Sequence, residues 1–244
     1  MKLLLTSSGI TNPSLRAALE KLLGKPISEA NALFVPTGMH PFPSGGQYAF
    51  KAMCGEMSGR LCGLGWKSLG LLELTALTSI SKDVWVNAVQ EADALLVWGG
   101  DPIYISYWMK ETGLGELLHT LDDTHVYVGV SAGAMAATTL FGETYPETPT
   151  CRQEVISSEQ VTFHSTKGDF SMEFRTARGI GLVDFNIIAH LGAEWHTSAT
   201  IENAEIWANK VPVPTYAIDD SSGVQVVAGD VEVVTEGTWR LFNG

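Results

Sequence analysis

The chain has 244 residues, of which 45% are hydrophobic and 17% are charged, enough apolar material for a sizeable core in a single domain over residues 1–244. The net charge of −12 argues against nucleic acid or an anionic membrane surface as a partner. The three cysteines match no zinc spacing, and no apolar run is long enough for a signal peptide or a membrane span. We therefore expect a cytoplasmic protein with reduced thiols, and we predict neither a metal nor a cofactor.

Apolar runs of strand length alternate with segments of helical periodicity through the first half of the chain. The expected strands are residues 2–6, 32–35, 66–72, 94–98 and 126–130. A helix is expected between its cap Asn12 and Gly24, and further helices over 48–60, 81–92 and 103–119. Strands that are apolar throughout, separated by helices, are typical of a parallel sheet that is covered on both faces. The sequence therefore predicts an α/β fold with a mostly parallel sheet.

The second half of the chain shows a different pattern. Residues 141–178 are polar and lack clear periodicity apart from a weak β-like run at 160–164, so we expect a long loop or lid there. An apolar strand ends at His190, and a helix is expected over 199–208. The chain closes with four short expected strands, at 216–218, 223–228, 231–235 and 239–242. Their turn residues predict an antiparallel meander.

Residues 125–137 read HVYVGVSAGAMAA and carry the strongest functional signal. A strand runs directly into Ser131, which Gly129 and Gly133 flank, and small residues typical of a helix follow. This is the pattern of a nucleophile elbow, in which a strained serine between strand and helix tolerates only small neighbours. The alternative is a turn of small residues between a buried strand and a packed helix. We interpret Ser131 as a catalytic nucleophile.

Negative charge that develops on a carbonyl oxygen during attack needs hydrogen-bond donors near the serine. The backbone N–H of Ala132 lies at the expected helix start, where the dipole favours negative charge. The turn Gly99-Gly100 follows the neighbouring expected strand, so its N–H groups reach the same edge of the sheet. We predict Gly100 and Ala132 as the oxyanion donors, with an ordinary turn as the alternative at Gly100.

A serine hydroxyl needs a base within hydrogen-bond reach. His190 follows an apolar strand that ends at the same sheet edge as Ser131, which makes it the favoured base. His40, His164 and His196 are open as alternatives in loops. Glu194 and His196 near His190 resemble a metal-binding cluster only faintly, because Gly192 disfavours a helix that would bring these side chains to one face.

The base in turn needs a carboxylate that fixes its tautomer. Glu143 and Glu147 follow the elbow helix. Asp184, Glu194, Asp219 and Asp220 are rivals, although Asp219-Asp220 is more simply explained as a turn.

The motifs VWGGD at 97–101, GVSAGAM at 129–135 and GLVDFNIIAH at 181–190, with the tail YAIDDSSGVQV at 216–226, resemble the serine peptidase family of dipeptidase E and cyanophycinase. The resemblance spans most of the chain and implies a class I glutamine-amidotransferase-like fold. It implies Ser131 as nucleophile, His190 as base, and Gly100 and Ala132 as oxyanion donors. For the acid it implies a carboxylate after the serine helix, which Glu143 fits best.

The sequence also departs from that family. Residues 141–178 form a longer segment than the family has, and the region after His190 lacks the arginine with which dipeptidase E reads its aspartyl substrate. Arg152, Arg175 and Arg178 in the longer segment are the possible substitutes. The expected partner is a small peptide substrate, and a homodimer is an open expectation. An esterase of the α/β-hydrolase type and a non-catalytic small-molecule binder on the same scaffold are the alternative functions.

Overall fold

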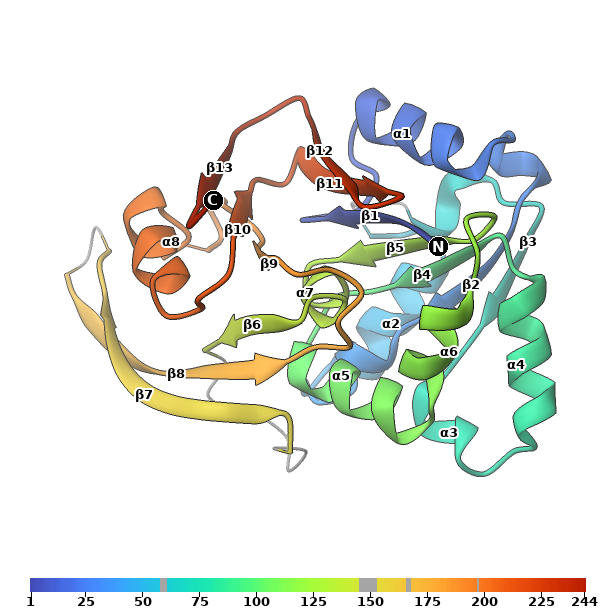
Figure 1. The fold of residues 1–244 in the computed structure, drawn as a ribbon, viewed down its shortest axis with the longest axis horizontal. Helices are drawn as coiled ribbons and strands as arrows, with labels where there is room; N and C mark the ends of the chain where they lie inside the picture. Colours follow the sequence, from blue (N-terminus) through green and yellow to red (C-terminus); the bar gives the residue numbers. More distant parts are fainter. Residues whose placement is uncertain (58–60, 145–152, 166–167, 197) are drawn as a thin grey trace.

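The centre of the computed structural model is a seven-stranded sheet in the order β12-β11-β1-β5-β4-β2-β3 (Figure 1). The structure describes residues 1–57, 61–144, 153–165, 168–196 and 198–244. The five parallel strands are β1 (Lys2–Thr6), β2 (Asn31–Val35), β3 (Ser68–Leu71), β4 (Ala94–Val97) and β5 (Val126–Val130). The predicted parallel sheet and its strands in the first half of the chain are confirmed.

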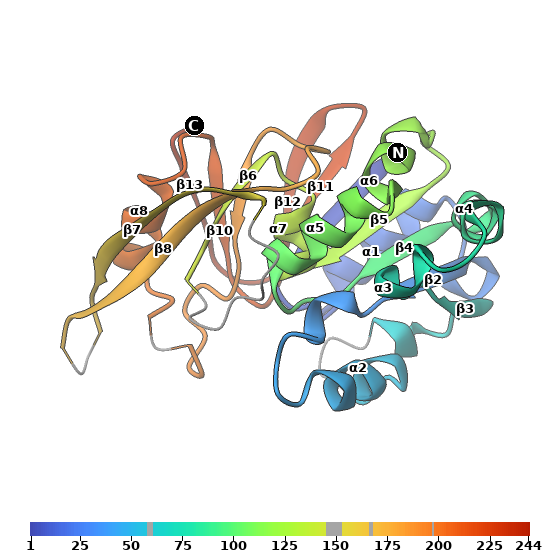
Figure 2. The ribbon, with the colours of Figure 1, turned by 90° about the horizontal axis from the view of Figure 1, so that it is seen from below.

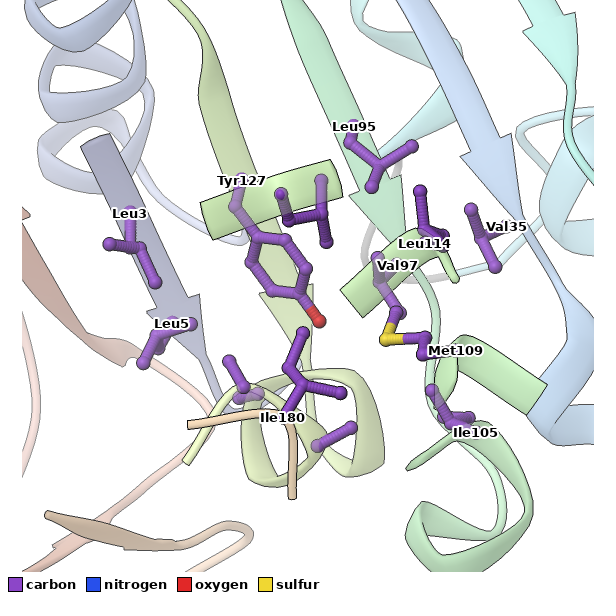
Figure 3. Close-up of a cluster of buried hydrophobic side chains, with 14 of the residues drawn as sticks. Leu3, Leu5, Val35, Leu95, Val97, Ile105, Met109, Leu114, Tyr127 and Ile180 are labelled. Atoms are coloured by element: carbon purple, nitrogen blue, oxygen red, sulfur yellow. The ribbon is translucent and has the colours of Figure 1, made fainter. Parts of the chain in front are cut away.

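Helices cover both faces of this sheet. They are α1 (Pro13–Leu23), α2 (Gly45–Met53), α3 (Leu74–Leu77), α4 (Lys82–Glu91), α5 (Pro102–Glu111), α6 (Leu114–Thr120) and α7 (Ala132–Ala136). Side chains alternate along β1, so Leu3 and Leu5 pack with residues of α3 to α7 while Leu4 packs with residues of α1 and α2. Figure 3 shows part of the first cluster, where Leu3, Val97 and Met109 surround the buried Tyr127. This double cover explains why the strands are apolar throughout.

The ends of the helices show where the local sequence was sufficient to predict a boundary and where it was not. Asn12 accepts a hydrogen bond from the Leu15 N–H at 2.9 Å, and Gly24 ends α1 in the left-handed conformation, as predicted. The single helix predicted over 103–119 is instead two helices, because Gly113 takes a φ of 76° between α5 and α6. The helix predicted over 48–60 ends early at Met53, and its residues 58–60 lie outside the described ranges.

Residues 141–178, for which a loop or lid was expected, contain most of a small antiparallel sheet. Its strands are β6 (Leu140–Glu143), β8 (Phe170–Arg178) and β7 (Val155–Phe163), in that order. Both views show the β7–β8 hairpin on the side of the molecule opposite β3 (Figures 1 and 2). The middle of β7 is exposed, so its sequence lacks the apolar alternation that marks a half-buried strand, and only the weak β-like run predicted at 160–164 overlaps it.

A third sheet contains β9 (Asn186–Ile188), β10 (Thr215–Ile218) and β13 (Trp239–Phe242), against which α8 (Ile201–Ala208) packs. The four C-terminal strands were predicted correctly, but they do not form one meander. After β10 the chain crosses into the central sheet, where β11 (Ser222–Val227) pairs with β1 and with β12 (Asp230–Thr235). It then returns so that β13 pairs with β10. None of the helices in the described ranges is both long and apolar enough to cross a bilayer.

Candidate active site

Ser131 lies between β5 and α7 in a strained backbone conformation. Its φ of 51° and ψ of −113° are values that residues with a side chain rarely adopt. A Cβ atom on Gly129 would lie 2.8 Å from the backbone of Ala134, and one on Gly133 would lie 2.2 Å from the carbonyl oxygen of Val97. Both glycines are therefore required sterically, as the elbow pattern predicts.

Gly100 and Ala132, the predicted oxyanion donors, line one pocket together with Ser131. Gly100 has a φ of 123°, and a Cβ atom there would lie 2.0 Å from the carbonyl oxygen of Gly38. The same carbonyl accepts a hydrogen bond from the Asp101 N–H at 2.8 Å. The turn after β4 is thus held against the loop after β2, with its backbone close to the serine.

His190 contacts Ser131 directly. Its Nε2 lies 2.9 Å from the Ser131 Oγ, within the distance that proton transfer requires. Its backbone N–H donates to the Oγ of Ser7 at 2.8 Å, and the ring of Trp195 packs edge-to-face against the imidazole at 4.7 Å between centroids. The ring is therefore held on two sides, by the end of β1 and by the segment after β9.

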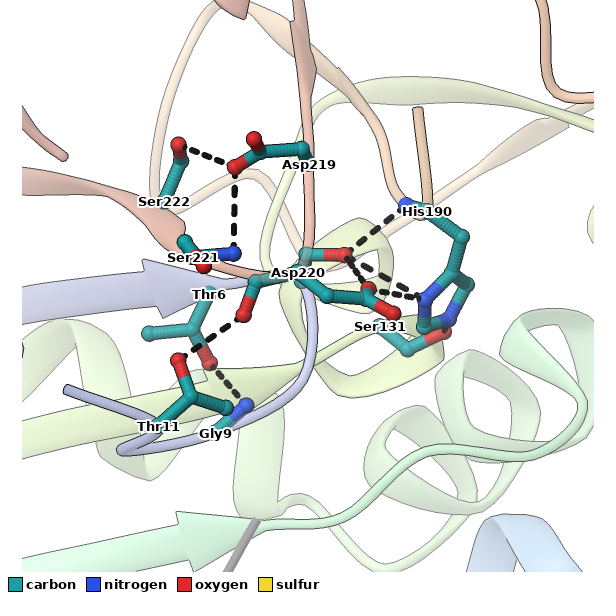
Figure 4. A network of polar contacts seen from close by, with 10 residues as sticks. Thr6, Gly9, Thr11, Ser131, His190, Asp219, Asp220, Ser221 and Ser222 are labelled. Atoms are coloured by element: carbon teal, nitrogen blue, oxygen red, sulfur yellow. Dashed lines mark hydrogen bonds and ion pairs between the residues drawn. The ribbon is translucent and has the colours of Figure 1, made fainter. Parts of the chain in front are cut away.

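Asp220 is the carboxylate that contacts His190. Its Oδ1 lies 2.7 Å from the His190 Nδ1, and the Ser7 hydroxyl donates to the same oxygen at 2.7 Å (Figure 4). Burial raises the pKa of Asp220, but hydrogen bonds from His190, Ser7 and Ser8 outweigh that effect and hold the pKa well below its usual value. An ionised carboxylate only accepts hydrogen bonds, so Nδ1 carries the hydrogen and Nε2 accepts from Ser131.

Glu143 was expected beside His190, but the structure places Asp220 there instead. Glu143 is buried at the end of β6, where its Oε1 accepts from the Thr144 N–H at 2.5 Å, and it lines the pocket beside Ser131. Its strand pairs with β8, in register with Arg175. Glu147, the second expectation for the acid, lies outside the described residues.

Strand register explains why Asp220 occupies this position. β9 and β10 are parallel neighbours with Ile188 opposite Ala217, and His190 and Asp220 each follow the carboxyl end of one of these strands. Two side chains beyond such ends meet at one sheet edge. In the sequence, β9 and β10 are two short apolar runs that are each followed by polar residues, and this pattern could have indicated the contact. Asp219-Asp220 also has the composition of a turn, so we interpreted the pair as a turn.

Two of the other histidines considered as bases have partners away from Ser131, and the third lies in the pocket. His40 pairs with Glu73, and His164 pairs with Asp169 between β7 and β8. His196 lines the pocket, and burial, followed by the neighbouring His190, lowers its pKa. His196 is therefore neutral at pH 7 and adds no positive charge to the pocket.

No group of three or more His, Cys, Asp or Glu side chains in the described ranges is arranged to hold a metal ion.

Three arginines were considered as residues that bind an acidic substrate. Of these, Arg175 is buried and donates to Glu173 at 2.8 Å. Arg152 lies outside the described residues. Arg178 ends β8 and is exposed; neither Arg175 nor Arg178 lines the pocket.

Comparison with known proteins places this geometry in a family. The profile of peptidase family S51 matches residues 3–234. Two solved structures share the fold: a peptidase from an acI-B1 Actinobacterium (19% identity, 99% of this chain and 93% of that chain, TM-score 0.60) and a Listeria monocytogenes EGD-e protein to which peptidase E identity has been attributed (16%, 97% and 98%, 0.58). No protein of curated function matches. The family match decides for a peptidase over the esterase and the non-catalytic binder: the chain belongs to peptidase family S51 and is a serine peptidase.

Proposed function

We propose that this serine peptidase hydrolyses short peptides, as a dipeptidase E-like enzyme, through Ser131, His190 and Asp220. The observation that carries the proposal is the continuous chain of contacts from Ser131 Oγ to His190 Nε2 at 2.9 Å and from His190 Nδ1 to Asp220 at 2.7 Å. This is the arrangement in which a base deprotonates a serine and a carboxylate stabilises the resulting imidazolium.

In the first half-reaction the Ser131 Oγ attacks the peptide carbonyl carbon while its proton moves to the His190 Nε2. The N–H groups of Gly100 and Ala132 stabilise the oxyanion. The C–N bond then breaks, and Nε2 returns the proton to the leaving amine. In the second half-reaction water attacks the acyl-enzyme, gives its proton to Nε2 and releases the acid, after which Ser131 regains its proton. Asp220 remains ionised throughout.

A fluorophosphonate probe tests this assignment, because it phosphonylates only an activated serine. We expect labelling at Ser131, loss of labelling in Ser131→Ala, and a loss of rate of about 10³-fold or more in His190→Ala. His164→Ala is the matched control and is expected to label at the wild-type rate. Labelling at another serine, or an effect of His164→Ala equal to that of His190→Ala, would contradict the proposal. The homodimer and the cytoplasmic location stay predictions.

A further inference from the structure

The three residues of the proposed triad come from two different sheets. Ser131 follows β5 of the central sheet, whereas His190 and Asp220 follow β9 and β10 of the third sheet. The distance between the Ser131 Oγ and the His190 Nε2 therefore depends on how the two sheets are held against each other. A residue of the central sheet that binds both His190 and Asp220 would fix this distance.

Ser7, which directly follows β1, makes both of these contacts. The residue is fully buried, and its Oγ accepts a hydrogen bond from the backbone N–H of His190 at 2.8 Å. The same hydroxyl donates to the Asp220 Oδ1 at 2.7 Å, and its oxygen lies 3.3 Å from the His190 Nδ1. One hydroxyl group thus joins the main chain of the base to the carboxylate that orients the ring.

Strand register fixes Ser7 relative to the nucleophile. β1 and β5 are parallel neighbours with Thr6 opposite Val130, and the Ser131 N–H donates to the carbonyl oxygen of Thr6 at 2.9 Å. Ser7 and Ser131 are therefore the residues that follow two paired positions. The Ser7 hydroxyl lies at a defined place relative to Ser131, and from that place it holds the other two residues of the triad.

The backbone conformation of His190 gives the contact with Ser7 a further role. The φ of His190 is 64°, in the left-handed region that a residue with a Cβ atom rarely adopts. Such a conformation persists only where surrounding contacts hold it, and the bond from the His190 N–H to Ser7 is one of them. Without that bond the backbone can relax and carry the ring away from Ser131, and a displacement of about 1 Å can lower a catalytic rate about 100-fold.

We propose that Ser7 is a positioning residue of this peptidase, whose hydroxyl holds the His190 main chain and the Asp220 carboxylate in place relative to Ser131. Ser7 is fully buried and does not line the pocket, so it acts through these residues and not on the substrate. This inference rests on the proposed function and adds one side chain to its machinery. The alternative is a purely structural role, in which the hydroxyl only satisfies buried polar groups.

Saturation kinetics of fluorophosphonate labelling at Ser131 separate these two roles, because the probe reacts with an activated serine whatever the natural substrate is. The kinetics give an affinity constant, KI, and a maximal rate constant, kinact. We expect Ser7→Ala to lower kinact about 10- to 100-fold with KI unchanged. A structural role alone would lower the free energy of unfolding and leave kinact of the folded protein at the wild-type value. That result would overturn the inference.

Ser222→Ala is the matched control. Ser222 is also fully buried, at the start of β11, and its hydroxyl donates to the Asp219 Oδ1 at 2.6 Å. This variant loses a comparable bond to the neighbouring carboxylate, so we expect lower stability at unchanged kinact. An equal fall in kinact in Ser7→Ala and Ser222→Ala would count against the inference, because it would indicate a general loosening of the turn between β10 and β11.

Ser7→Cys provides the test if Ser7→Ala does not fold. Cysteine is close to serine in shape, but its thiol is only a weak donor and acceptor, so kinact should fall about tenfold. A wild-type kinact in folded Ser7→Cys would contradict a positioning role. Absence of labelling at Ser131 in the wild-type protein would instead defeat the proposed function.

Discussion

Asp219 and Asp220 are neighbours in the chain, yet their carboxylates bind different parts of the molecule. The Oδ1 of Asp219 accepts from the Ser221 N–H at 3.0 Å and from the Ser222 hydroxyl at 2.6 Å. Asp220 instead contacts His190 and Ser7 (Figure 4). One carboxylate closes the turn between β10 and β11, and that turn directs the other into the site.

This division of roles separates the effects of two matched substitutions. Asp220→Asn should lower kcat/KM by about 10³- to 10⁴-fold, because His190 loses the group that fixes its tautomer. Asp219→Asn should remove roughly 1–3 kcal/mol of stability by leaving turn donors without a charged acceptor, with kcat nearly unchanged. Steady-state kinetics and thermal unfolding of both variants check this; equal losses of activity would contradict it.

The lowered pKa of Asp220 predicts a pH dependence of stability. The carboxyl ordinarily titrates near 3.8, and the folded protein holds its pKa below that value. The ionised carboxylate therefore stabilises the folded protein at any pH above the pKa that Asp220 has in the unfolded chain. This contribution is lost as the pH falls through the pKa that Asp220 has in the folded protein. We expect the stability advantage of the wild type over Asp220→Asn to be constant between pH 7 and 5 and to shrink below pH 4. Urea unfolding at each pH measures it; an advantage that grows on acidification would contradict the sign.

The glycines of the elbow give a prediction about packing. Gly133→Ala places a methyl group 2.2 Å from a backbone oxygen, so we expect a loss of about 2–4 kcal/mol in unfolding free energy and loss of labelling at Ser131. Gly46→Ala is the control, because Gly46 lies exposed in α2 with nothing within 4 Å of the added atom. It should stabilise the protein by about 0.5–1 kcal/mol. Chemical denaturation of the two variants decides the matter, and similar effects would count against the steric explanation.

The described cysteines should differ sharply in reactivity. Cys54 is exposed, whereas burial, followed by the neighbouring Cys54, raises the pKa of the Cys62 thiol to about 12. The thiolate is the reactive form, so at pH 8 iodoacetamide should modify Cys54 and leave Cys62 intact until the protein is unfolded. Peptide mass spectrometry in a Cys151→Ser background checks this. Rapid alkylation of native Cys62 would be inconsistent with its burial.

Structural features were predicted correctly from the sequence wherever the local residue pattern and the long-range packing favour the same structure. The apolar strands, the cap at Asn12 and the small residues around Ser131 each follow from a few neighbouring residues, and the structure contains all of them. The contact between Ser131 and His190 was also expected, because both follow strands that end at one edge.

Two features could not be predicted from local sequence. The strands β7 and β8 pair with each other, and the exposed residues in the middle of β7 interrupt its apolar pattern, so the local sequence gives only a weak indication of them. The partner of His190 depends on which strand lies beside β9. That neighbour is β10, and only the tertiary arrangement shows it. Distance along the chain instead favours Glu143, which is closer to Ser131 than Asp220 is.

The path of the last strands has a consequence for the protein during its own synthesis. Asp220 reaches His190 only after β10 has joined β9 and β11 has paired with β1. A nascent chain that already displays Ser131 and His190 still lacks the group that orients the imidazole. From the proposed role of Asp220 we therefore expect the full rate of hydrolysis only after β10 and β11 have been synthesised and have paired with β9 and β1.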